Sequence, residues 1–96
     1  MSKYQEGWQD FIKLCYTAKD AKTLSELLEV FLTPEEKENI AMRYLIVKEL
    51  LKKEKTQRQI AKDLNISIAK ITRGSNELKR LSDKLRQYLY GFIKSQ

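Results

Sequence analysis

Apolar residues recur at helical spacing along most of the chain. Two stripes have the i, i+3, i+4, i+7 spacing that places side chains on one face of an amphipathic helix. They are Trp8, Phe11, Ile12 and Cys15, followed by Leu24, Leu27, Leu28 and Phe31. Strands are disfavoured, because alternating apolar and polar runs are missing and the chain has only three glycines and one proline. The pattern therefore predicts an all-α protein whose first two helices carry these stripes.

A longer helix is predicted from Pro34 to about Lys53. Thr33 can cap its first turn, proline suits the first helical position, and Glu36 stands three residues after the cap. Its apolar positions extend beyond one stripe, which favours a central helix packed on several sides. These positions are Ile40, Tyr44, Leu45, Ile46, Val47, Leu50 and Leu51. A last helix begins after Ser82. Its stripe is Leu85, Tyr88, Leu89 and Phe92.

The stretch of about residues 56–80 has the spacing of a helix-turn-helix. Thr56 and Gln59 are the residue pair of a capping box, and Ser67 can cap the second helix. Ala61 is small where the two helices cross, and Asn65 tolerates the left-handed backbone of a tight turn. The apolar wedge between the helices consists of Ile60, Leu64, Ile66 and Ile71. A chance amphipathic αα-hairpin is the alternative, but it does not require turn, caps and wedge together.

A helix-turn-helix places its second helix in the major groove of DNA. The start of the first helix then lies where such motifs grip the DNA backbone or a flanking base, and Lys79 and Arg80 are expected to bind phosphate. For each residue, an ordinary solvated side chain is the alternative. The candidate DNA-binding residues are Thr56, Gln57, Arg58, Ser67, Ile68, Ala69, Lys70, Thr72 and Lys79.

The excess of positive charge lies in residues 56–96 of the chain. The formal net charge is +6, and residues 56–96 alone hold nine Lys or Arg against three Asp or Glu. A basic end on a nearly neutral body suits a polyanion such as nucleic acid, because phosphate neutralisation releases counterions. A basic surface that only confers solubility is the alternative.

Composition limits the other classes of function. The chain of 96 residues suffices for one small domain, taken as residues 1–96, and its apolar helix surface favours a core shared with a second copy. Neither a catalytic nor a metal site is predicted, because histidine is absent, the single cysteine lies on an apolar stripe and carboxylates are scattered. No apolar run approaches the ~20 residues of a membrane span, and no targeting signal is seen. We therefore expect a cytoplasmic protein without a membrane partner.

Several short motifs resemble the tryptophan operon repressor family. The string Ile71–Asn76 is unusual, because a glycine inside a helix costs about 1 kcal/mol relative to alanine. Further matching positions are Leu32–Pro34, Arg43, Thr56–Arg58 and Leu78–Lys79, so the resemblance covers about residues 24–89. It implies about six helices per chain, interlocked into a homodimer that binds operator double-stranded DNA. It also implies L-tryptophan as corepressor, with no other cofactor.

The resemblance also implies where the ligand binds. The indole is expected to lie between Arg43 and Arg73, because planar guanidiniums stack on aromatic faces and also bind carboxylates. Gly74 is expected to leave room for the ring beside the backbone. Thr33 and the carbonyls near Val30 and Leu32, supplied by the partner chain, would hold the carboxylate and ammonium. Glu77 completes this candidate set.

Three departures from the family pattern affect the expected function. Glu77 replaces a common serine, Lys70 a common threonine, and Leu45 a common arginine. Glu77 either accepts a hydrogen bond from the ligand ammonium or pairs with Arg73 or Arg80. The prediction is a repressor of tryptophan biosynthesis genes that is activated by L-tryptophan. The alternatives are a helix-turn-helix regulator of the same fold that does not sense tryptophan, and a purely structural helical adaptor.

Overall fold

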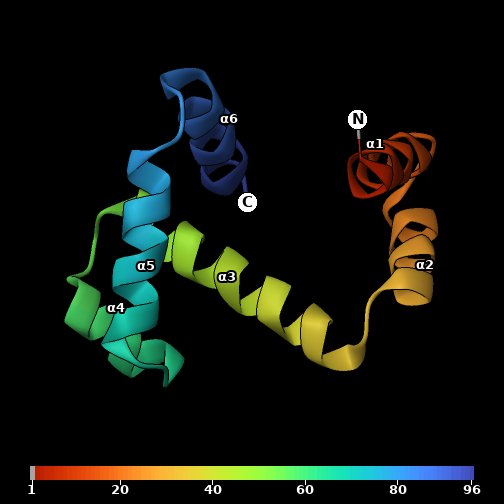
Figure 1. Cartoon of the computed structure of the whole chain (residues 1–96). Helices are drawn as coiled ribbons and strands as arrows, with labels where there is room; N and C mark the ends of the chain where they lie inside the picture. Colours follow the sequence, from red (N-terminus) through yellow and green to blue (C-terminus); the bar gives the residue numbers. More distant parts are fainter. Residues whose placement is uncertain (1) are drawn as a thin grey trace. The chain divides into compact units, whose positions relative to one another are not determined.

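Residues 2–96 form six α-helices and no strand in the computed structural model (Figure 1). They are α1 (Lys3–Tyr16), α2 (Ala21–Phe31), α3 (Pro34–Lys52), α4 (Gln57–Leu64), α5 (Ile68–Lys79) and α6 (Asp83–Lys94). The prediction of an all-α protein of about six helices is confirmed. The chain divides into two compact units, up to Lys37 and from Glu38 onward, so the single domain stays a prediction. None of the helices in residues 2–96 is long and apolar enough to cross a membrane.

In the N-terminal unit, residues 2–37, local capping hydrogen bonds stabilise the starts of the helices. The carboxylate of Asp20 accepts a hydrogen bond of 2.7 Å from the N–H of Thr23 at the start of α2. This bond holds the pKa of Asp20 below its ordinary value. Thr33 and Glu36 form the predicted reciprocal pair at the start of α3, with bonds of 2.9 and 3.1 Å.

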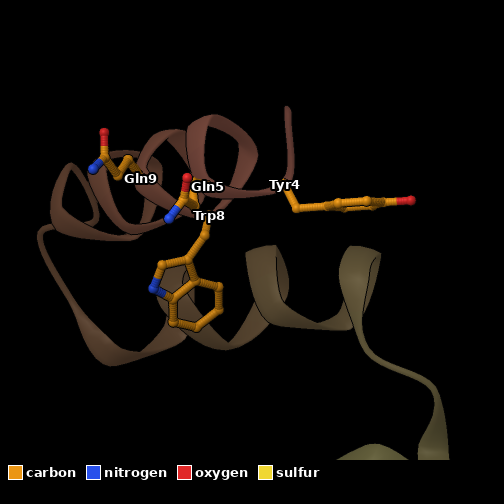
Figure 2. Close-up of a pocket in the computed structure, with 4 residues that line it drawn as sticks. All are labelled: Tyr4, Gln5, Trp8 and Gln9. Carbon is orange, nitrogen blue, oxygen red and sulfur yellow. The ribbon is translucent and has the colours of Figure 1, made fainter. Parts of the chain in front are cut away.

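Helices α1 and α2 contain no buried residue. Phe11 connects their two apolar stripes, with ring centroids 5.7 Å from Trp8 and 5.2 Å from Phe31. The indole of Trp8 is nevertheless 63% exposed and the ring of Phe31 52% exposed. Tyr4, Gln5, Trp8 and Gln9 of α1 line a hollow of about 400 Å³. Figure 2 shows that Trp8 and Gln9 leave α1 in opposite directions. The stripes therefore meet without forming a closed core.

The C-terminal unit, residues 38–96, does form a core. Ile60 of α4 and Ile71 of α5 have no exposed surface, and Ile46 of α3 and Ala61 of α4 join them. Met42, Leu50, Leu64 and Ile66 pack around this cluster. The predicted wedge between the two helices is thus confirmed, and α4 lies against α5 (Figure 1).

Helix α3 differs from its prediction. It was expected to pack on several sides, but within the chain only Ile46 and Leu51 of this helix are buried. Ile40, Tyr44 and Leu45 remain between 37% and 52% exposed. The packing around Ile46 covers one face of α3, whereas its other apolar positions stay in contact with solvent.

Candidate functional site

The helix-turn-helix is fixed by the local signals that predicted it. Thr56 and Gln59 exchange hydrogen bonds of 3.1 and 2.8 Å across the first turn of α4. Asn65 ends α4 with φ 55° and ψ 50°, the left-handed conformation that the turn needs. Ser67 then caps α5 by accepting a hydrogen bond from the N–H of Lys70. The α4–turn–α5 hairpin therefore presents the N-terminal ends of both helices in defined positions.

Seven of the nine DNA-binding candidates gather at these two ends, whereas Thr72 lies in the second turn of α5 and Lys79 at its C-terminal end. Thr56, Gln57 and Arg58 begin α4, and Ser67 to Lys70 begin α5. All candidates are exposed except Gln57, which is half-buried. The hydroxyl of Thr72 donates a 3.0 Å hydrogen bond to Oε1 of Gln57. Because this bond occupies the amide oxygen, the NH₂ group of Gln57 remains available to donate to a phosphate or base.

An ion pair joins this hairpin to α3. Nζ of Lys55 lies 2.7 Å from the carboxylate of Asp63 on α4 and 3.6 Å from that of Glu49 on α3. The hydrogen bond to Asp63 raises the pKa of Lys55 above its ordinary value. The loop after α3 is thus connected to both helices that it separates.

A cavity of about 620 Å³ lies beside the hairpin, within the C-terminal unit. This volume falls in the range of about 300–1,000 Å³ that small-molecule sites occupy. Its lining comes mainly from α3 and α5. The residues are Asn39, Met42, Arg43, Ile46, Val47, Lys70, Arg73, Gly74, Glu77, Leu78, Leu81 and Leu89. An apolar wall with a few charged groups suits a ligand that combines a ring with ionic substituents.

The charged lining consists of three cations and one carboxylate. Arg43 comes from α3, whereas Lys70, Arg73 and Glu77 lie at i, i+3 and i+7 on one face of α5. Glu77 forms an exposed ion pair with Arg80 at 3.4 Å. Within residues 2–96, none of the three cations makes an ion pair. The structure thus brings together Arg43, Arg73, Gly74 and Glu77 from the ligand prediction, and adds Lys70 to them.

Gly74 has a different close neighbour from the one expected. A Cβ atom at this position would lie 2.8 Å from Cγ2 of Ile46, closer than real carbon atoms approach. The missing side chain therefore lets α5 pack against α3 in the same chain. Gly74 also lines the cavity, but the space gained above its Cα is filled by Ile46.

The remaining ligand candidates belong to the N-terminal unit. Val30 is 75% exposed in the last turn of α2, and Leu32 ends that helix. The side chain of Thr33 is engaged in the cap of α3. Their part in a ligand site stays a prediction.

Sequence reasoning missed much of the apolar lining. Asn39, Met42 and Val47 were not assigned to a site, nor were Leu78, Leu81 and Leu89. Asn39 and Val47 each stand four residues from Arg43 along α3, which places them on the same helix face and was the signal available. Leu81 and Leu89 follow α5, so only the tertiary structure reveals them as lining residues.

Comparison with known proteins gives one consistent family. A family model described as Trp repressor protein matches residues 6–91. The chain is 44% identical over 85 residues to a Trp operon repressor homolog of Chlamydia caviae, covering 88% of this chain and 84% of the relative. A homolog of that name from Chlamydia trachomatis serovar D is also 44% identical, with 88% and 90% covered. One from Vibrio vulnificus is 46% identical over 88 residues, with 88% and 86% covered.

Proposed function

We propose that this chain, which belongs to the Trp repressor family, represses transcription of tryptophan biosynthesis genes when L-tryptophan is bound. One observation carries the proposal: α5 contains candidate residues for both sites. Its first turn holds the DNA-binding candidates, and its next two turns hold Arg73, Gly74 and Glu77, which line the cavity. A ligand in the cavity therefore changes the surroundings of the helix that enters the DNA groove.

The two cavity arginines suit the proposed ligand. A planar guanidinium stacks on the face of an aromatic ring and also binds a carboxylate through parallel hydrogen bonds. Arg43 and Arg73 approach the cavity from two different helices, so an indole between them would have a cation on each face. Thr33 and the carbonyls of Val30 and Leu32, from a second copy of the chain, are proposed to hold the carboxylate and ammonium.

A homodimer is proposed because the single chain leaves large apolar side chains exposed. Trp8, Phe31 and Tyr88 are 63%, 52% and 76% exposed. Covering such surface stabilises an assembly by roughly 25 cal/mol for each Å² removed from water. Light scattering is expected to give twice the chain mass at micromolar concentration, and a stable monomer there would contradict the dimer.

Glu77 is proposed to contact the ligand ammonium. Its carboxylate lines the cavity while also pairing with Arg80, and it is the only acidic group in the lining. Indole-3-propionate keeps the ring and the carboxylate but lacks the amine, so it should bind much less tightly than L-tryptophan. Glu77→Ser should narrow that difference. If both ligands bind equally tightly to the unmutated protein, Glu77 pairs only with Arg80 and does not contact the ligand ammonium.

Calorimetric titration of L-tryptophan tests the function directly. The family function predicts saturable heat and a rise in the unfolding midpoint, because a ligand that binds only the folded state stabilises it. Arg43→Ala and Arg73→Ala should each remove most of the heat. The absence of both heat and stabilisation would favour the alternative, a helix-turn-helix regulator of the same fold that does not sense tryptophan.

A further inference from the structure

Lys70 belongs to both sites at once. It is the third residue of α5, three positions after the Ser67 cap, among the exposed candidates for DNA contact. It also lines the cavity, on the same helix face as Arg73 and Glu77. The function proposed above uses the two sites separately and leaves open how one affects the other.

The surroundings of Lys70 are electropositive. The first turn of α5 contains no acidic residue, and the free N–H groups of a helix start already carry partial positive charge. Arg73 stands one turn further on, and Arg43 faces the same cavity from α3. The single carboxylate of the lining, Glu77, stands two turns away, about 10.5 Å along the helix axis, and is paired with Arg80. Lys70 therefore lacks a counterion within residues 2–96.

L-tryptophan alone does not supply that counterion. It is a zwitterion, and its only carboxylate has two guanidiniums in the cavity as stronger, bidentate partners. The ammonium of Lys70 is exposed and therefore free to bind an anion from outside the chain, and the exposed end of α5 is the part that would meet a DNA phosphate. A lysine combines an apolar stem with a charged head that stays at the water boundary.

We propose that Lys70 couples the cavity to DNA, its stem lying against the bound indole while its ammonium contacts a phosphate. A filled cavity holds the stem outward, whereas an empty one leaves it free to turn inward. Lys70 therefore binds DNA more tightly when the ligand is present, and it transmits part of the effect of L-tryptophan on DNA affinity. This inference rests on the proposed function.

The test measures a coupling factor, which is the ratio of the affinities for DNA with and without L-tryptophan. The DNA is a duplex selected from a random library. The factor is measured for the wild type, Lys70→Met, Lys70→Arg and the control Lys79→Met. Lys79 lies at the other end of α5 and is not part of the lining. Lys70→Met should reduce the factor by about five-fold or more, and Lys70→Arg should retain it. Lys79→Met should lower affinity equally with and without ligand.

Two results would overturn the inference. One is an unchanged coupling factor in Lys70→Met, which would make Lys70 an ordinary phosphate contact. The other is loss of L-tryptophan binding by Lys70→Met in the absence of DNA, measured calorimetrically, which would make it only a wall of the cavity. Failure of the wild type to bind any selected duplex with L-tryptophan is a different result, because it contradicts the proposed function itself.

Discussion

The two units of this chain are stabilised in different ways. In the N-terminal unit, α1 and α2 bury no residue, although their stripes contain tryptophan and phenylalanine. In the C-terminal unit, Ile60 and Ile71 are completely buried in helices of only 8 and 12 residues. Helix formation is therefore a poor guide to which region has its own core. The N-terminal helices bury little apolar surface within their own unit, whereas the α4–turn–α5 hairpin holds its shape by internal packing.

The largest expected effect comes from opening the hairpin core. Ile71→Ala should lower the free energy of unfolding by about 2–5 kcal/mol, because it leaves a cavity among fully buried side chains. Ile12→Ala in α1, where the side chain is 47% exposed, is the matched change in the other unit. Its cost should fall as the protein is diluted, since it acts through the proposed dimer and dilution removes that contribution from the wild type as well, while the cost of Ile71→Ala should depend less on concentration. Urea unfolding at two protein concentrations measures both, and equal concentration dependence would contradict the comparison.

A smaller effect is expected where α5 packs on α3. Gly74→Ala should cost about 1–2 kcal/mol, because overpacking of about 1–3 kcal/mol exceeds the gain of up to about 1 kcal/mol in helix propensity. Its Cβ would meet Cγ2 of Ile46 at 2.8 Å. Ile46→Leu removes that branch methyl, so the double variant should lose less than the sum of the single changes. Additive losses in denaturant unfolding would show that the contact is not the cause.

One substitution should stabilise the C-terminal unit. Lys53 has φ 57°, a left-handed conformation that a residue with a Cβ adopts at a cost. Lys53→Gly should therefore raise the free energy of unfolding by about 0.5–1 kcal/mol. Asn65, with φ 55°, is the matched control, because asparagine tolerates this region and Asn65→Gly should change little. A larger gain at Asn65 than at Lys53 would contradict this explanation.

The smallest expected effect is a difference between the two units in how the stability of their helix caps depends on pH. Asp20 caps α2 and its pKa lies below the ordinary value of 3.8, because the carboxylate accepts the N–H of Thr23. Its contribution to stability is therefore complete above that value and is lost as the pH falls through the folded pKa. Thr56 and Ser67, the caps of α4 and α5, do not titrate in acid. The amide shift of Thr23 should thus move with a midpoint below 3.8, and a midpoint above it would contradict the cap.

Features that depend on neighbouring residues could be predicted from the sequence. The capping box of Thr56, the left-handed turn at Asn65 and the Ser67 cap each involve residues within five positions of one another, so composition and spacing suffice. The left-handed Lys53 was missed, because lysine gives no signal for that conformation. The polar residues around Lys53 predicted only that α3 ends in this region.

Features that depend on tertiary packing could not be predicted in the same way. Arg43 and Arg73 were assigned through family resemblance, and only the structure places them on one cavity. Lys70 was assigned to DNA alone, because its exposed position at a helix start fits that role and spacing does not reveal the cavity wall. For Gly74, the sequence indicated a close approach, but only the structure identifies Ile46 as the neighbour.

The central claim is that the ligand cavity and the DNA-reading end share α5 and therefore affect one another. It is tested most directly by the affinity of the wild-type protein for a selected, fluorescently labelled duplex, measured by anisotropy with and without saturating L-tryptophan. We expect L-tryptophan to tighten binding by at least about five-fold. Identical affinities under both conditions, with L-tryptophan shown calorimetrically to be bound, would contradict the claim.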